Sequence, residues 1–140
     1  MKLMRITTAL VLAAATVVAA QGAKTFKTRL GTVPVEAATA AALTGSGEVT
    51  AVLAANKLSV KGTFKGLQGP ATAARLHVAP MGLRGPAMLD LMVTRATSGT
   101  ISGELTLTPT QADHLTRNRV YVQLHSEKAP DGNLWGWLLP

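Results

Sequence analysis

The sequence predicts an all-β domain: an antiparallel, Greek-key-like sandwich or barrel with one short helix, preceded by a signal peptide. Three observations support this prediction. Apolar and polar residues alternate with period two in several short segments, which is typical of half-buried strands. The chain contains 13 Gly and 7 Pro, which favour turns between these segments. At 140 residues and 4% aromatic content, we expect one domain with an aliphatic core.

The first 20 residues have the three parts of a signal peptide. Lys2 and Arg5 give a basic start, an uncharged run follows over residues 6–20, and small residues end it. We expect cleavage near residues 20–23, which leaves a single domain over residues 21–140. The run is shorter than the roughly 20 apolar residues that a membrane span needs. The protein is therefore expected to be exported to the periplasm or the extracellular space, with an uncleaved, membrane-associated form as the alternative.

The alternating segments predict the strands in chain order. The clearest is Leu58 to Lys65, where Leu, Val, Gly and Phe alternate with Ser, Lys and Thr. The Ala-rich stretch 36–42 is expected to be a loop or irregular arm, because Pro34 and Thr39 disfavour a helix there. The other predicted strands cover residues 26–35, 44–55, 73–78, 88–94, 99–107, 120–125 and 133–138.

One helix is expected before the last two strands. Thr108 is a favoured N-cap residue, and Pro109 stands at the first helical position, where its missing N–H costs nothing. The predicted helix runs through Leu115. Pro130, Asp131 and Gly132 then predict a turn between the last two strands.

The chain is basic, with 14 Lys and Arg against 7 Asp and Glu. Nucleic-acid binding requires these charges to cluster on one face, but they are spread along the sequence. Lys57, Lys61 and Lys65 share one strand parity, and we interpret this stripe as a solvated strand face that discourages edge-to-edge pairing. An acidic protein partner or an anionic membrane surface is therefore expected rather than nucleic acid.

The order of motifs resembles the CHRD (chordin-type) domain family, in its bacterial exported form, over nearly the whole chain after the signal peptide. The most specific part is the close, where Tyr121–Ser126 and Pro130–Leu138 look like the family's terminal strand pair. The remaining matches are 26–31 with Pro34 and Val35, 58–67, 74–77, and Gly82, Gly85 and Pro86.

The resemblance implies an all-β domain outside the cytoplasm. In animals such domains occur in secreted growth-factor antagonists, whereas bacterial members generally have no assigned activity. Two departures from the family pattern concern polar groups. Arg75-Leu76-His77 stands where the family has a His-hydrophobic-His pair, and 132–136 lacks the acid and the base of the family's Gly-Glu-hydrophobic-Arg-Gly ending.

Strand parity predicts a polar and aromatic face on the outside of the domain. If the three segments that carry it are neighbouring strands, eight side chains share this face: Arg75, His77, Tyr121, Gln123, His125, Asn133, Trp135 and Trp137. An Arg beside two exposed Trp can stack on them, and exposed Trp residues mark a contact surface. Six residues are thus the candidate protein-docking site: Arg75, His77, Tyr121, His125, Trp135 and Trp137. The alternative is that the arm or other parts of the same chain cover Trp135 and Trp137.

A metal site on His77 and His125 is a second hypothesis. Neutral imidazoles on adjacent strands can bind Cu or Zn, but two ligands are few, and a structural hydrogen-bonding role is the competing interpretation. His114 is expected on the helix surface. No cofactor is otherwise expected.

No motif for catalysis is present in the sequence. It has no Gly-x-Ser-x-Gly, no His-Glu-x-x-His, no phosphate-binding glycine loop and no Cys. We therefore expect a non-enzymatic binding or accessory module, with a metal-binding protein or a membrane-anchored subunit of a larger complex as alternatives.

Overall fold

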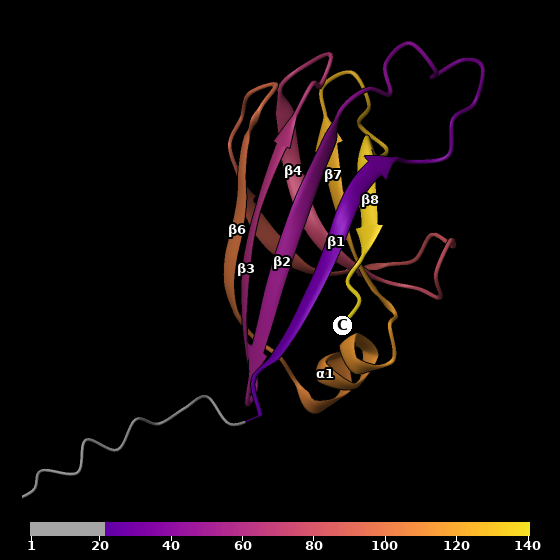
Figure 1. The fold of residues 1–140 in the computed structure, drawn as a ribbon. Helices are drawn as coiled ribbons and strands as arrows, with labels where there is room; N and C mark the ends of the chain where they lie inside the picture. The colour runs from indigo at the N-terminus through magenta and orange to yellow at the C-terminus, as the bar shows by residue number, and fades with distance from the viewer. Residues whose placement is uncertain (1–21) are drawn as a thin grey trace, which may run out of the picture.

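The computed structural model describes residues 22–140, in which eight strands form a closed antiparallel barrel with one helix (Figure 1). The predicted signal peptide, residues 1–20, lies outside the described residues. The elements are β1 (Lys24–Thr32), β2 (Ser46–Ala54), β3 (Lys57–Lys65), β4 (Ala71–Val78), β5 (Ala87–Val93), β6 (Gly99–Thr106), α1 (Pro109–Thr116), β7 (Val120–Ser126) and β8 (Leu134–Trp137).

The strand order around the barrel is β1-β2-β3-β6-β5-β4-β7-β8. Consecutive hairpins account for most of the pairs, while β3–β6 and β4–β7 join strands that are not consecutive in sequence. Closure is achieved where β8 pairs with β1, through Gly31 opposite Trp135 and Thr32 opposite Leu134. The predicted all-β antiparallel fold is confirmed, and this last pairing makes it a barrel.

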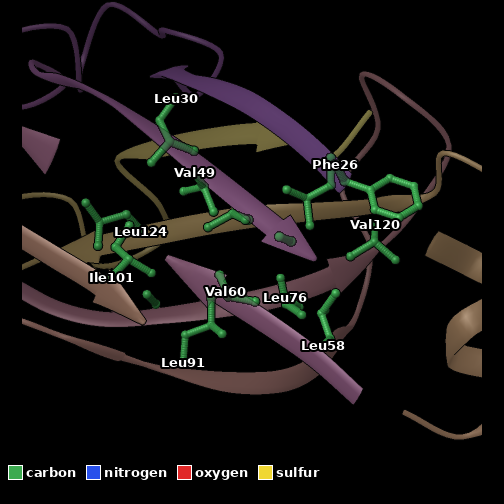
Figure 2. Close-up of a cluster of buried hydrophobic side chains, with 14 of the residues drawn as sticks. Phe26, Leu30, Val49, Leu58, Val60, Leu76, Leu91, Ile101, Val120 and Leu124 are labelled. Atoms are coloured by element: carbon green, nitrogen blue, oxygen red, sulfur yellow. The ribbon is translucent and has the colours of Figure 1, made fainter. Parts of the chain in front are cut away.

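The barrel interior is filled by the apolar parity of the strands (Figure 2). Phe26 and Leu30 of β1 pack in this interior in one cluster with Val49 of β2, Val60 of β3 and Leu124 of β7. These side chains are at most 2% exposed. Because the pattern has period two, each inward residue is followed by one on the outside of the barrel.

Helix α1 begins as predicted. The Thr108 hydroxyl accepts from the Gln111 N–H at 3.2 Å, and the Gln111 side chain accepts from the Thr108 N–H at 2.9 Å. This reciprocal pair is a capping box, with Pro109 in the first turn. Leu115 is fully buried in the main core, so α1 covers one end of the barrel (Figure 1).

The arm, which we define as residues 33–45, is irregular as predicted. It contains turns but no strand or regular helix. β1 ends at Thr32, three residues earlier than predicted, because the chain leaves the sheet before Pro34, which has no N–H to donate. The Val33 N–H still donates to the Asn133 carbonyl at 3.1 Å.

The lysine stripe lies on the outside of β3, where Lys57, Lys61 and Lys65 are all exposed. The interpretation that it protects a sheet edge is wrong. β3 pairs with β2 on one side and with β6 on the other, so it has no free edge.

Barrel closure depends on the absence of a side chain at Gly136. A Cβ there would lie 2.6 Å from the Arg29 carbonyl oxygen and would collide with Thr28. We expect Gly136→Ala to lower the free energy of unfolding by about 2–4 kcal/mol, measured by urea denaturation. The matched control is Gly31→Ala on the paired strand, where a Cβ meets nothing within 4 Å. The control should change stability by no more than about 0.5 kcal/mol; equal losses in both variants would contradict this account.

Candidate functional site: the covered outer face of β4, β7 and β8

The predicted outward residues do come together on the outside of the barrel. β7 pairs with β4 on one side and with β8 on the other. The register forms two cross-strand rows and leaves His125 opposite Ala73. The rows are His77–Tyr121–Trp137 and Arg75–Gln123–Trp135. We define the outer face as the six residues of these two rows together with His125.

Most of the outer face is not exposed, which corrects the prediction of a solvated docking surface. Trp137 is 8% exposed and Tyr121 1%, and every residue of β7 is buried. Trp135 is half-buried against Val33, Leu43 and Ala129, so the arm covers it. The alternative interpretation, in which the chain covers its own Trp residues, is the correct one.

The aromatic rings of the outer face form one cluster. The Tyr121 ring lies 4.9 Å from the His77 ring in a stacked arrangement and 4.5 Å from the Trp137 ring, between ring centroids. Trp135 meets Tyr121 and Trp137 edge to face at 5.7 and 4.8 Å. This cluster forms a second, smaller core outside the barrel.

The β4–β5 loop, residues 79–86, covers one part of this face and is held there by three side chains. Nδ1 of His77 lies 2.9 Å from the Gly85 carbonyl oxygen, and the Gly85 N–H donates to the Tyr121 hydroxyl at 3.0 Å. Nε1–H of Trp137 donates to the Ala79 carbonyl at 3.0 Å. Ala79 is buried and Gly85 is partly buried, so these bonds replace water on the side of the loop that faces the barrel.

The β7–β8 loop, residues 127–133, covers the other part in the same way. Nδ1 of His125 lies 2.8 Å from the Pro130 carbonyl oxygen, and Nε2 of Gln123 donates to the Asp131 carbonyl at 3.4 Å. Asn133, predicted on the outer face, is fully buried, accepts from the Ser126 hydroxyl and donates to the Thr44 carbonyl of the arm.

Arg75 takes a different partner from the predicted one. Its Nε lies 3.0 Å from an Asp90 carboxylate oxygen on β5, so the guanidinium is held away from the Trp residues. Both side chains of this pair are substantially exposed, and such pairs contribute little to stability.

The two histidines share one protonation pattern. A carbonyl oxygen can only accept, so the contacts to Gly85 and Pro130 assign the ring hydrogen to Nδ1 in both His77 and His125. Burial lowers the pKa of His125 below the ordinary value of 6.5, electrostatic interactions with Arg75 and His77 act in the same direction, and the Pro130 hydrogen bond and Asp131 oppose them. The structural hydrogen-bonding role predicted for both residues is confirmed.

Two polar atoms of this site have no partner. Nε2 of His77 and Oε1 of Gln123 are buried without a hydrogen bond. Nε2 of His125 faces the Gln123 amide nitrogen at 3.2 Å. Within residues 22–140, no three His, Cys, Asp or Glu side chains converge as a metal-binding group.

A cleft that the sequence analysis missed lies beside the outer face. It has a volume of about 470 Å³ and lies between the arm and the β7–β8 loop, with Arg84 of the β4–β5 loop on its wall. Arg84 donates to the Asp131 carbonyl at 3.2 Å. The Gly and Pro content predicted these segments as loops, but not that they converge. The lining residues are Val33, Pro34, Glu36, Thr39, Leu43, Arg84, Lys128, Ala129, Pro130, Asp131 and Gly132.

The geometry defines a β-barrel protein whose outer face is covered by its own loops. A family model described as the CHRD domain matches residues 15–138, and the chain belongs to this family. A search of curated proteins and a search of solved structures found no match. No helix in the described part of the chain has the length and hydropathy needed to cross a bilayer.

The hydrogen bond from Trp137 predicts a specific cost of substitution. Trp137→Phe keeps an aromatic ring but leaves the buried Ala79 carbonyl without its donor. We expect the free energy of unfolding to fall by about 2–3 kcal/mol, because the unpaired carbonyl adds to the loss of ring contacts. Urea denaturation measures the change. Trp135→Phe, which breaks no such side-chain hydrogen bond within residues 22–140, should cost less, and the reverse order would contradict the assignment.

The lowered pKa of His125 predicts that stability depends on pH. The unfolded chain takes up a proton near the ordinary pKa of 6.5, whereas the folded protein does so only at lower pH. The unfolded state thus binds more protons in this window, and stability falls as the pH drops from about 7.5 to about 5. Urea denaturation of metal-free protein across this range measures the slope. His125→Gln should flatten it; an unchanged slope in that variant would assign the effect to other groups.

Proposed function

We propose that this protein is an exported, non-enzymatic accessory module that binds a partner protein in the cleft between the arm and the loops. The observation that carries the proposal is the distribution of exposed apolar side chains. In the described part of the chain, four large ones are more than half exposed: Val35 at 56%, Met81 at 58%, Leu83 at 58% and Met92 at 74%.

Three of these four belong to the two segments that flank the cleft. Val35 follows the lining residue Pro34 in the arm, and Leu83 precedes the lining residue Arg84 in the β4–β5 loop. Both segments leave the barrel on the same side (Figure 1). Exposed apolar groups around a concave site are typical of surfaces that contact other molecules.

The charges at the cleft favour a particular kind of partner. Arg84 and Lys128 bring positive charge to its wall, and the whole chain carries twice as many basic as acidic residues, 14 against 7. Glu36 and Asp131 bring an equal number of negative charges to the lining, so the cleft itself presents both signs. The occupant that fits best is an extended segment of another exported protein that presents an apolar side chain between charged ones, and the basic excess of the whole chain favours a segment that is acidic overall.

This proposal moves the docking surface from the strands to the loops. Of the six residues predicted for docking, His77, Tyr121, His125 and Trp137 support the loops from beneath. Their contribution to binding is indirect, because they hold Ala79, Gly85 and Pro130 in place.

Site-specific photo-cross-linking tests the proposal. A photoreactive amino acid at Leu83, in cells that make the protein, should give one discrete adduct with an exported protein. The matched control is the same amino acid at Met92, which is equally apolar and lies outside the cleft on β5. An absent adduct at Leu83, or the same adduct from Met92, would contradict the proposal.

The purified partner then allows a quantitative comparison. Leu83→Asp should weaken its binding to the purified protein by about 10-fold or more, because an apolar contact at the rim is lost. Met92→Asp should leave affinity unchanged within about 2-fold. Both positions are exposed, so neither variant is expected to unfold the barrel. Equal losses of affinity in the two variants would place the binding surface elsewhere.

A further inference from the structure

Between His77 and His125 the structure places three hydrogen-bond acceptors but few donors. In both rings Nδ1 holds the hydrogen and donates it to a loop carbonyl, so Nε2 carries a lone pair. Oε1 of Gln123 is the third acceptor. These side chains are 8%, 9% and 4% exposed for His77, His125 and Gln123, respectively.

These buried acceptors lower the stability of the folded protein unless a cation or a water molecule binds to them. Nε2 of His77 and Oε1 of Gln123 have no partner, and an unsatisfied buried acceptor costs about 1–3 kcal/mol. Nε2 of His125 accepts a hydrogen bond from the Gln123 amide alone. Buried acceptors of this kind are satisfied by a cation or by a buried water molecule, and an ion at Nε2 of His125 would replace the Gln123 amide there.

The spacing of the two rings fits a shared ion. Their centroids are 6.2 Å apart with an angle of 33° between the ring planes. An ion that lies about 2.0 Å from each Nε2 places the ring centres about 6 Å apart. Nδ1–H bonds to backbone carbonyls are also the usual way in which metal-binding imidazoles are oriented.

The type and number of the ligand atoms determine which ion fits the site. It contains two neutral imidazole nitrogens and one amide oxygen, with no carboxylate or thiolate within the group. Hard ions such as Mg²⁺ and Ca²⁺ require several oxygen ligands, and structural Zn²⁺ requires four ligands. Arg75 lies in register with Gln123, and its positive charge further disfavours a dication. A monovalent ion can be held by two nitrogen donors, and it meets half the repulsion from Arg75, whose charge is also offset by Asp90.

We propose that His77 and His125 bind a single Cu⁺ ion through their Nε2 atoms, with Oε1 of Gln123 as a weak third ligand. The stacked Tyr121 ring and the two covering loops then shield the ion from water. This site lies beneath the loops and is separate from the cleft proposed for the partner protein.

Anaerobic titration tests the site. Metal-free protein is titrated with Cu⁺ against a chromophoric Cu⁺ chelator, and one ion per chain is expected. His77→Gln and His125→Gln should each weaken Cu⁺ binding by about 100-fold, because each removes one of two strong ligands. The matched control is His114→Gln on α1, which should change affinity by no more than about 2-fold.

A second measurement on the unmodified protein does not depend on whether these variants fold. X-ray absorption at the copper edge should show two nitrogen donors at about 2 Å and no sulfur. Failure to retain Cu⁺ against the chelator would mean that only water occupies the site and would overturn the proposal. Tighter binding of Zn²⁺ than of Cu⁺, or equal losses in all three His variants, would also overturn it.

Discussion

Burial of β7 on both faces is the constraint on which the rest of the structure depends. Its inner face packs in the barrel, and its outer face lies under the β4–β5 and β7–β8 loops. The backbone carbonyls on the barrel-facing side of these loops need side-chain partners in place of water. His77, Trp137 and His125 supply these partners at Gly85, Ala79 and Pro130. Polar side chains on the outside of the barrel are therefore structural elements that fix the course of the loops.

The same contacts determine what the site can do chemically. Because each loop carbonyl takes the hydrogen of one Nδ1, both imidazoles direct a lone pair into a space with few donors. The loops that are held down also form one wall of the cleft, where Arg84 donates to Asp131. The proposed ion site and the proposed docking cleft are thus two consequences of one arrangement, one beneath the loops and one beside them.

The sequence predicted the framework well because its signals are local. Period-two alternation located the strands, the Thr108-Pro109 pair located α1, and parity placed Tyr121, Gln123 and His125 on one face. The burial of that face was not predictable, because an outward His or Trp has the same parity whether solvent or a loop covers it. The cleft was missed for a related reason: Pro34, Arg84 and Lys128 come from three segments whose convergence leaves no periodic signal.

The most direct test of this account is the protonation state of the two imidazoles, measured by ¹⁵N NMR of metal-free protein at neutral pH. If loop carbonyls hold both rings, the neutral imidazoles of His77 and His125 will each carry the hydrogen on Nδ1 and none on Nε2. His114, which lies on the helix, serves as the internal reference. A neutral ring of either residue with its hydrogen on Nε2 would contradict the account.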